Sequence, residues 1–219
     1  MTSPARRHYQ RISAALAAAD AGDQPMQGDA YELMQAALFE DYRRLKSTQS
    51  MEKKAEIKRE ILPKYAEYVS GVLEAGQGAQ DDVLMRVMLW RIDAGDLAGA
   101  IAIAKYAIKH GLTPPDQFER GTAAIIAEEV ADQVLKQLDE EGDSAPLLEQ
   151  LKEVETLTAD ADMHDQIRAK LHKALGYACR ATGQLEDAQV NLERALSLND
   201  RIGVKKDLER LERELKQRT

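Results

Sequence analysis

The sequence predicts an all-α protein, and three features of its composition and spacing lead to that prediction. Aromatic residues make up only 5% of the 219 residues, although strands favour aromatic and β-branched side chains. Ala, Leu, Glu and Lys, which are good helix formers, are abundant. In several segments apolar residues recur at three- and four-residue intervals, which is the spacing of one face of a helix.

The first 70 residues are expected to hold a basic arm and a basic helical segment. Residues 1–29 form the arm and a linker: 4–20 can make a short helix, and Gly and Pro residues follow it. Residues 30–70 form the second segment, in which apolar residues lie on one helical face. We expect this helix to run as far as Leu62, because Pro63 then removes a backbone donor.

Two helical hairpins are expected within residues 71–200. Residues 81–115 read as two helices around a tight turn, with Asp81 as an N-cap and Gly111 as a stop signal. Residues 171–199 have the same construction and follow the spacing of a tetratricopeptide repeat, so we predict two tetratricopeptide-like hairpins. The matching positions are Gly95 with Gly183, Leu97 with Leu185, Ala100 with Ala188 and Ala107 with Ala195.

Further helices are expected between the hairpins and at the end of the chain. Residues 122–158 read as helices that break at 142–146. Residues 201–219 form a short amphipathic helix, whose apolar residues make a seam of less than two heptads. This seam either packs on the preceding hairpin or serves as an oligomerisation interface, and its residues are Val204, Leu208, Leu211 and Leu215.

Charge is distributed unevenly along the chain, although the formal net charge is −8. Residues 1–19 carry three Arg and no acidic residue, and residues 43–64 carry eight basic and three acidic residues. Residues 116–165 carry fifteen acidic residues against three basic ones, which suits protein contacts better than nucleic acid. The basic runs are either solvated helix faces or DNA contacts. The candidate DNA-binding residues are Arg6, Arg7, Arg11, Arg43, Arg44, Lys46, Lys53, Lys54, Lys58 and Arg59.

No motif in the sequence specifies a catalytic centre. There is no G-x-x-x-x-G-K-[ST] loop for ATP phosphates, and the single Cys179 excludes a disulfide framework and favours a reducing compartment. No stretch of eighteen apolar residues suggests a membrane span. Two acidic groups could hold metal, but helix caps and acidic helix starts explain them as well, so we assign no metal site. They are Asp160, Asp162, His164 and Asp165, and Glu128, Glu129 and Asp132, with Asp81 and Asp82 as a further pair.

Four long strings in the sequence resemble one protein family from end to end. They are MTSPARRH (1–8), GVLEAGQGAQDDVLMRVMLWRIDAGDLAGAIAIAKYAIKHGLT (71–113), LTADADMHDQIRAKLHK (157–173) and GVKKDLERLERELK (203–216). The chain resembles the small terminase subunit of cos-packaging, temperate contractile-tailed bacteriophages and related prophages. This family is also described as the terminase endonuclease subunit.

The resemblance implies a role in DNA packaging. A small subunit of this family binds the cohesive-end site of concatemeric double-stranded phage DNA and recruits and directs the large ATPase and nuclease subunit. It further implies a homo-oligomer without membrane contact, in the cytoplasm of the bacterial host and outside the virion. We expect no cofactor on this chain, and Mg²⁺ and ATP for the holoenzyme.

Two alternatives stay open from the sequence. In the first, the chain itself contributes metal-dependent endonuclease activity. In the second, it is an intracellular helical-repeat adaptor that binds proteins and has no DNA role, as its acidic total suggests.

Overall fold

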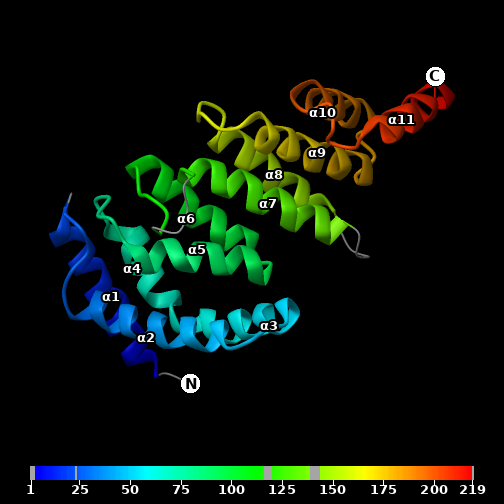
Figure 1. Ribbon diagram of the computed structural model, residues 1–219. Coiled ribbons are helices and arrows are strands. Elements are labelled where there is room, and N and C mark those ends of the chain that lie inside the picture. Colours follow the sequence, from blue (N-terminus) through cyan, green and yellow to red (C-terminus); the bar gives the residue numbers. More distant parts are fainter. Residues whose placement is uncertain (1–2, 23, 116–119, 139–143, 219) are drawn as a thin grey trace. The chain divides into compact units, whose positions relative to one another are not determined.

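The all-α prediction is confirmed. The computed structural model describes residues 3–22, 24–115, 120–138 and 144–218, which form eleven α-helices and one 3-10 helix, with no strand among them (Figure 1). The chain divides into two compact units, Met1–Thr122 and Ala123–Thr219.

The first unit contains six α-helices and a 3-10 turn among its described residues. Its core is rich in large side chains, and Tyr65 and Trp90 meet edge to face with ring centroids 6.1 Å apart. In chain order the elements are α1 (Pro4–Ala21), α2 (Asp29–Lys46), α3 (Met51–Ile61), η1 (Leu62–Lys64), α4 (Ala66–Ala75), α5 (Asp82–Ala94) and α6 (Leu97–His110).

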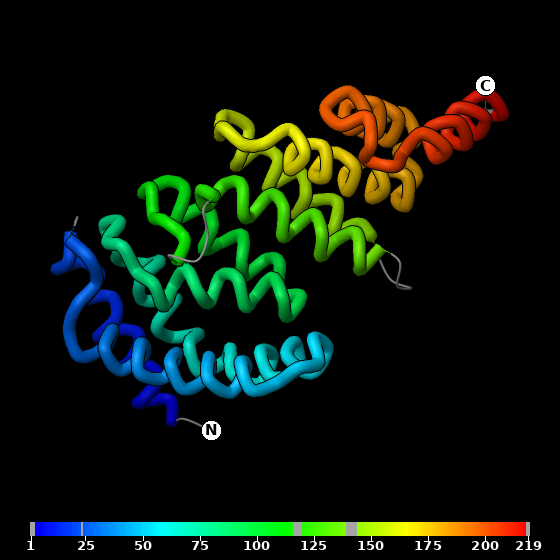
Figure 2. The backbone as a smooth tube through the Cα atoms, in the orientation of Figure 1, coloured from blue at the N-terminus to red at the C-terminus, as the bar shows by residue number. Residues whose placement is uncertain are grey.

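The basic arm folds as helix α1, which packs along α4. Ser3 caps α1, and Ala14 and Ala18 face inward and are buried. The following linker is also held, because Met26 is buried and its N–H donates to the carbonyl of Gln80 over 3.0 Å. The tube in Figure 2 follows this path from α1 through the linker into α2.

Gly71 in α4 permits the close approach of α1. A Cβ atom at this position would overlap the carbonyl oxygen of Arg11 and lie 3.0 Å from the backbone nitrogen of Ala15. Both obstacles are backbone atoms, so no side-chain rotation can relieve the overlap.

Gly71→Ala is therefore expected to push α1 away from α4 and to lower the free energy of unfolding of the first unit by about 1–3 kcal/mol. Urea unfolding followed by fluorescence measures this change, because the sole tryptophan, Trp90, lies in the first unit. Gly121→Ala is the control, since nothing lies within 4 Å of its added Cβ. Equal stability of the two variants would contradict the close packing of α1.

The long helix expected up to Leu62 is wrong, because the helix breaks between α2 and α3. The hydroxyls of Ser47 and Thr48 donate to the carbonyl of Arg44 over 2.8 and 3.1 Å. Ser50 then caps α3 by accepting from the N–H of Lys53 over 3.3 Å. Such side-chain bonds to the backbone compete with helix continuation, so the polar run at 47–50 ends one helix and begins the next.

The first predicted hairpin is present as α5 and α6, with the expected caps. Asp81 accepts from the N–H of Leu84 over 2.8 Å at the start of α5. Gly95 and Gly111 end the two helices in the left-handed conformation, with φ of 86° and 70°.

The second unit contains five described helices, of which α9 and α10 form the other predicted hairpin. They approach closely at Gly176, where a Cβ atom would lie 2.6 Å from the side chain of Leu192. The tetratricopeptide-like character of the two hairpins stays a prediction, and the helix break expected at 142–146 lies partly outside the described residues. The helices are α7 (Thr122–Leu138), α8 (Ala145–Leu157), α9 (Asp165–Ala181), α10 (Leu185–Leu198) and α11 (Lys205–Arg218).

The apolar seam of the last helix packs inside the second unit, against α10. Val204, Leu208 and Leu211 are buried, and Leu215 is half-buried. This is the intramolecular alternative that the sequence left open, and its role in oligomerisation stays a prediction.

Candidate nucleic-acid interface

Four of the ten candidate DNA-binding side chains contact groups on other helices of the first unit. Arg44 makes two hydrogen bonds to the carboxylate of Glu60, at 3.0 and 2.6 Å. The remaining three are Lys58, which is buried and pairs with Asp93; Arg59, whose Nε donates to the carbonyl of Ala94 over 3.1 Å; and Arg11, which lies 3.8 Å from Glu74.

A first group of basic side chains lies where α1 meets η1. Arg6 and Arg7 of α1 and Lys64 of η1 line a groove of about 470 Å³, together with residues of α2. Both arginines are exposed. Lys64 is anchored by an ion pair with the buried Asp41, which also accepts a hydrogen bond from Tyr65 over 2.5 Å. The basic arm and the second basic block therefore meet at this groove.

A second group lies at the junction of α2 and α3. Lys46 extends over the ring of Tyr42, with Nζ 5.4 Å from the ring centroid, and Arg43 is 3.4 Å from Glu40 on the same exposed face. Lys53 is exposed and Lys54 half-exposed in the first turn of α3. Within the described part of the chain, neither lysine makes an ion pair. These cations are available to an external anion, because exposed pairs such as Arg43 with Glu40 contribute little.

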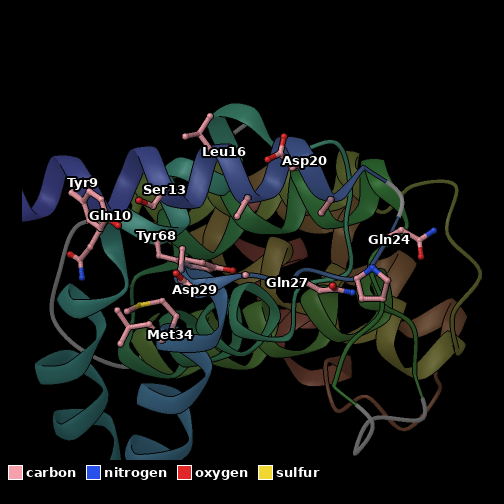
Figure 3. A pocket seen from close by; sticks show the side chains of 16 residues that line it. Tyr9, Gln10, Ser13, Leu16, Asp20, Gln24, Gln27, Asp29, Met34 and Tyr68 are labelled. Atoms are coloured by element: carbon pink, nitrogen blue, oxygen red, sulfur yellow. The ribbon is translucent and has the colours of Figure 1, made fainter.

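A larger groove of about 830 Å³ opens between α1, the linker and the start of α2 (Figure 3). Tyr68 lies at its floor, Tyr9 and Leu16 come from α1, and Met34 comes from α2. It shares Gln10, Leu33 and Met34 with the basic groove, so the two grooves adjoin. The sequence did not predict this groove, because the exposure of apolar residues on α1 depends on where α1 packs.

Beneath the groove a carboxyl group is buried, and no basic side chain among the described residues pairs with it. Asp81 accepts a hydrogen bond from Tyr68 over 2.6 Å in addition to capping α5, and it is fully buried. Burial raises the pKa of Asp81 to about 6, against the lowering effect of its hydrogen bonds. Burial and the neighbouring Asp81 also raise the pKa of Tyr68 far above its usual value. The sequence identified Asp81 as a cap but gave no sign of its burial.

Two of the acidic candidates are paired with a lysine, and an arginine holds the turn that carries two others. Lys170 bonds to Glu128 over 3.1 Å and to Asp132 over 2.8 Å. Arg168 donates to the carbonyls of Thr158 and Ala161 and so holds the turn that contains Asp160 and Asp162. Among the described residues, no three His, Cys, Asp or Glu side chains gather as a metal site would require.

The ion pair of the buried Lys58 with Asp93 commits a candidate DNA-binding side chain to the fold. Asp93→Ala leaves the ammonium group of Lys58 without its partner, in a site where that side chain is 11% exposed. We expect the free energy of unfolding to fall by about 2 kcal/mol, and not more, because Asp93 itself is half-exposed. Lys58→Met keeps the apolar stem and lets Asp93 return to water, so its cost is about 1 kcal/mol or less. Urea unfolding with Trp90 fluorescence compares the two, and equal losses would contradict this account.

These observations define an all-helical protein whose first unit carries clusters of basic side chains. The family model described as "Phage small terminase subunit" matches residues 35–166, and the chain belongs to this family. No helix among the described residues is long and apolar enough to cross a membrane.

Two curated relatives agree with this assignment. The chain is 48% identical to the "Terminase, endonuclease subunit" of Escherichia phage P2, over 99% of this chain and 87% of the relative. It is 24% identical to the "Probable terminase, endonuclease subunit" of Haemophilus phage HP1, over 84% of this chain and 69% of that protein. No solved structure matches the chain.

Proposed function

We propose that this chain recognises the cohesive-end packaging site of phage DNA through its first unit and recruits the large terminase subunit to it in the host cytoplasm. The observation that carries the DNA part is the cluster at the α2–α3 junction, where Lys53 and Lys54 have no carboxylate partner among the described residues. Exposed cations of this kind contact phosphates and release counterions.

The two basic groups flank α2 and offer separate phosphate contacts. Arg6 and Arg7 share their groove with Leu33 and Ala37 of α2, whereas Lys46 ends that helix. Lys46 is nine positions after Ala37 on the helix, which corresponds to a rise of about 14 Å, so the groups reach different phosphates of one duplex. Such contacts position the protein, while base readout requires side chains in a groove of the DNA.

The second unit is proposed to meet the large subunit, because its exposed acidic side chains would be repelled by DNA. Asp160, Asp162 and Asp165 are all exposed around the turn before α9. ATP hydrolysis and the Mg²⁺ that it uses are assigned to the large subunit, because this sequence contains no phosphate-binding loop.

The names of both relatives favour a second candidate function, in which the chain itself cuts DNA. Purified chain would be incubated with cohesive-end DNA and Mg²⁺, and the products mapped for nicks. We expect no specific cutting without the large subunit, since Lys170 occupies Glu128 and Asp132. Staggered cuts at the cohesive-end site by the chain alone would establish the endonuclease candidate.

The test of DNA binding is a titration of cohesive-end DNA at several salt concentrations. Affinity should fall steeply with added salt, because each neutralised phosphate contributes about 0.9 to the slope of log K against log salt. Affinity that is absent, or that is insensitive to salt, would favour the adaptor function without DNA.

A further inference from the structure

Helix α1 carries an exposed apolar ridge opposite the face that packs on α4. Tyr9 is 70% exposed and Leu16 is 61% exposed, and Ile12 lies between them. Their spacing of three and four residues places them on one face, away from the buried Ala14 and Ala18. Figure 3 shows Tyr9, Ser13, Leu16 and Asp20 following one another along the helix, beside the groove. Apolar side chains in such a row mark a contact surface.

The ridge ends in opposite charges. Arg6 lies one turn before Tyr9, and Asp20 lies one turn after Leu16. Both charged residues are exposed, and neither makes an ion pair with another described residue. Fourteen residues of helix separate them by about 21 Å, with the apolar side chains between.

Two copies of this face of α1 are complementary when they lie antiparallel to each other. We propose that α1 pairs in an antiparallel, two-fold symmetric contact with α1 of a second copy of this chain. Arg6 of each copy then meets Asp20 of the other, and Tyr9 meets Leu16. Ser13, a small residue at the middle of the ridge, lies at the two-fold axis, where two helices approach most closely.

The register follows from the sequence positions alone. Residues that face one another across an antiparallel two-fold contact are equally far from its centre. Arg6 and Asp20 are both seven residues from Ser13 and so face each other directly, while Tyr9 and Leu16, at four and three residues from it, are offset by one residue, within reach of two large side chains. The exposed Leu33 of α2 lines the adjoining groove and extends the apolar surface toward the partner. Apolar contact supplies the affinity, and the charges fix the antiparallel direction.

The test is the mass of the full chain by sedimentation velocity across a concentration series, without DNA. We expect Arg6→Asp and Asp20→Arg each to weaken self-association about tenfold or more, because each places like charges together twice in the two-fold contact. The double variant with both changes should associate nearly as well as the unchanged chain, because it restores two opposite-charge pairs. Leu16→Glu should leave the chain monomeric at concentrations where the unchanged chain is dimeric.

Val190→Glu is the matched control, because Val190 is 65% exposed on α10 in the second unit. It should associate as the unchanged chain does. A monomer at all concentrations, an oligomer that Leu16→Glu leaves intact, or a double variant as weak as the single ones would each overturn the proposal.

Discussion

Replacing Lys53 and Lys54 together by Glu is expected to weaken binding of cohesive-end DNA by about ten- to a hundredfold at moderate salt. Both side chains lie in the first turn of α3 without a carboxylate partner among the described residues. Because two phosphates would no longer be neutralised, the slope of log K against log salt should also become shallower by about 2. Binding of labelled DNA, measured by fluorescence anisotropy between low and moderate salt, gives both quantities.

Lys205→Glu with Lys206→Glu is the matched control. These lysines are likewise adjacent and in the first turn of a helix, α11, and both are exposed, so the change in net charge is the same. The control should retain most of the affinity, since long-range repulsion between charges is screened beyond about 10 Å. If both double variants lost affinity equally, the effect would come from total charge and not from the α2–α3 junction.

The helical elements could be predicted because their signals are local. Asp81, Gly95 and Gly111 act through backbone groups within a few residues, so a cap or a left-handed stop can be recognised without tertiary contacts. The break at 47–50 was missed although its signal was also local. The hydroxyl side chains of Ser47, Thr48 and Ser50 indicate a break, but the apolar spacing on either side of them favoured one continuous helix.

The sequence could not predict whether a basic side chain is available to contact DNA, because its acidic partner can lie far away in the sequence. Lys58 meets Asp93, which is 35 residues away, and Arg44 meets Glu60, 16 residues away. Counting charges along the chain placed Arg44, Lys58 and Glu60 in one basic block and left Asp93 outside it. Only packing of α3 against α5 shows that Lys58 is committed to the fold while Lys53 is not.

A similar limit applies to helix α1. The sequence assigned Arg6 to DNA on charge alone, but its position relative to Asp20 matters only once Ala14 and Ala18 are known to face inward. The same arginine can then contribute to a contact between copies. The mass measurement without DNA and the titration with DNA separate these two roles.

Asp81→Asn is expected to change how the stability of the first unit depends on pH. The pKa of Asp81 is about 6 in the folded chain, above its ordinary value of 3.8, because the carboxyl is buried. The folded state therefore binds the proton more tightly than the unfolded state. The stability that this proton contributes is fully present below about pH 4 and is lost as the pH rises through 6.

The expected size of this effect is about 2 to 3 kcal/mol between pH 4 and pH 7.5, since one pKa unit corresponds to about 1.4 kcal/mol. Asn does not titrate, so the Asn variant should gain on the unchanged chain by that amount as the pH rises. Urea unfolding followed by Trp90 fluorescence measures the difference at each pH. Asp96→Asn is the control, because Asp96 caps α6 in the same way but is exposed. A difference between Asp81→Asn and the unchanged chain that stays constant with pH would mean that Asp81 ionises in the folded chain as readily as in water, and that its burial beneath the groove is relieved by solvent.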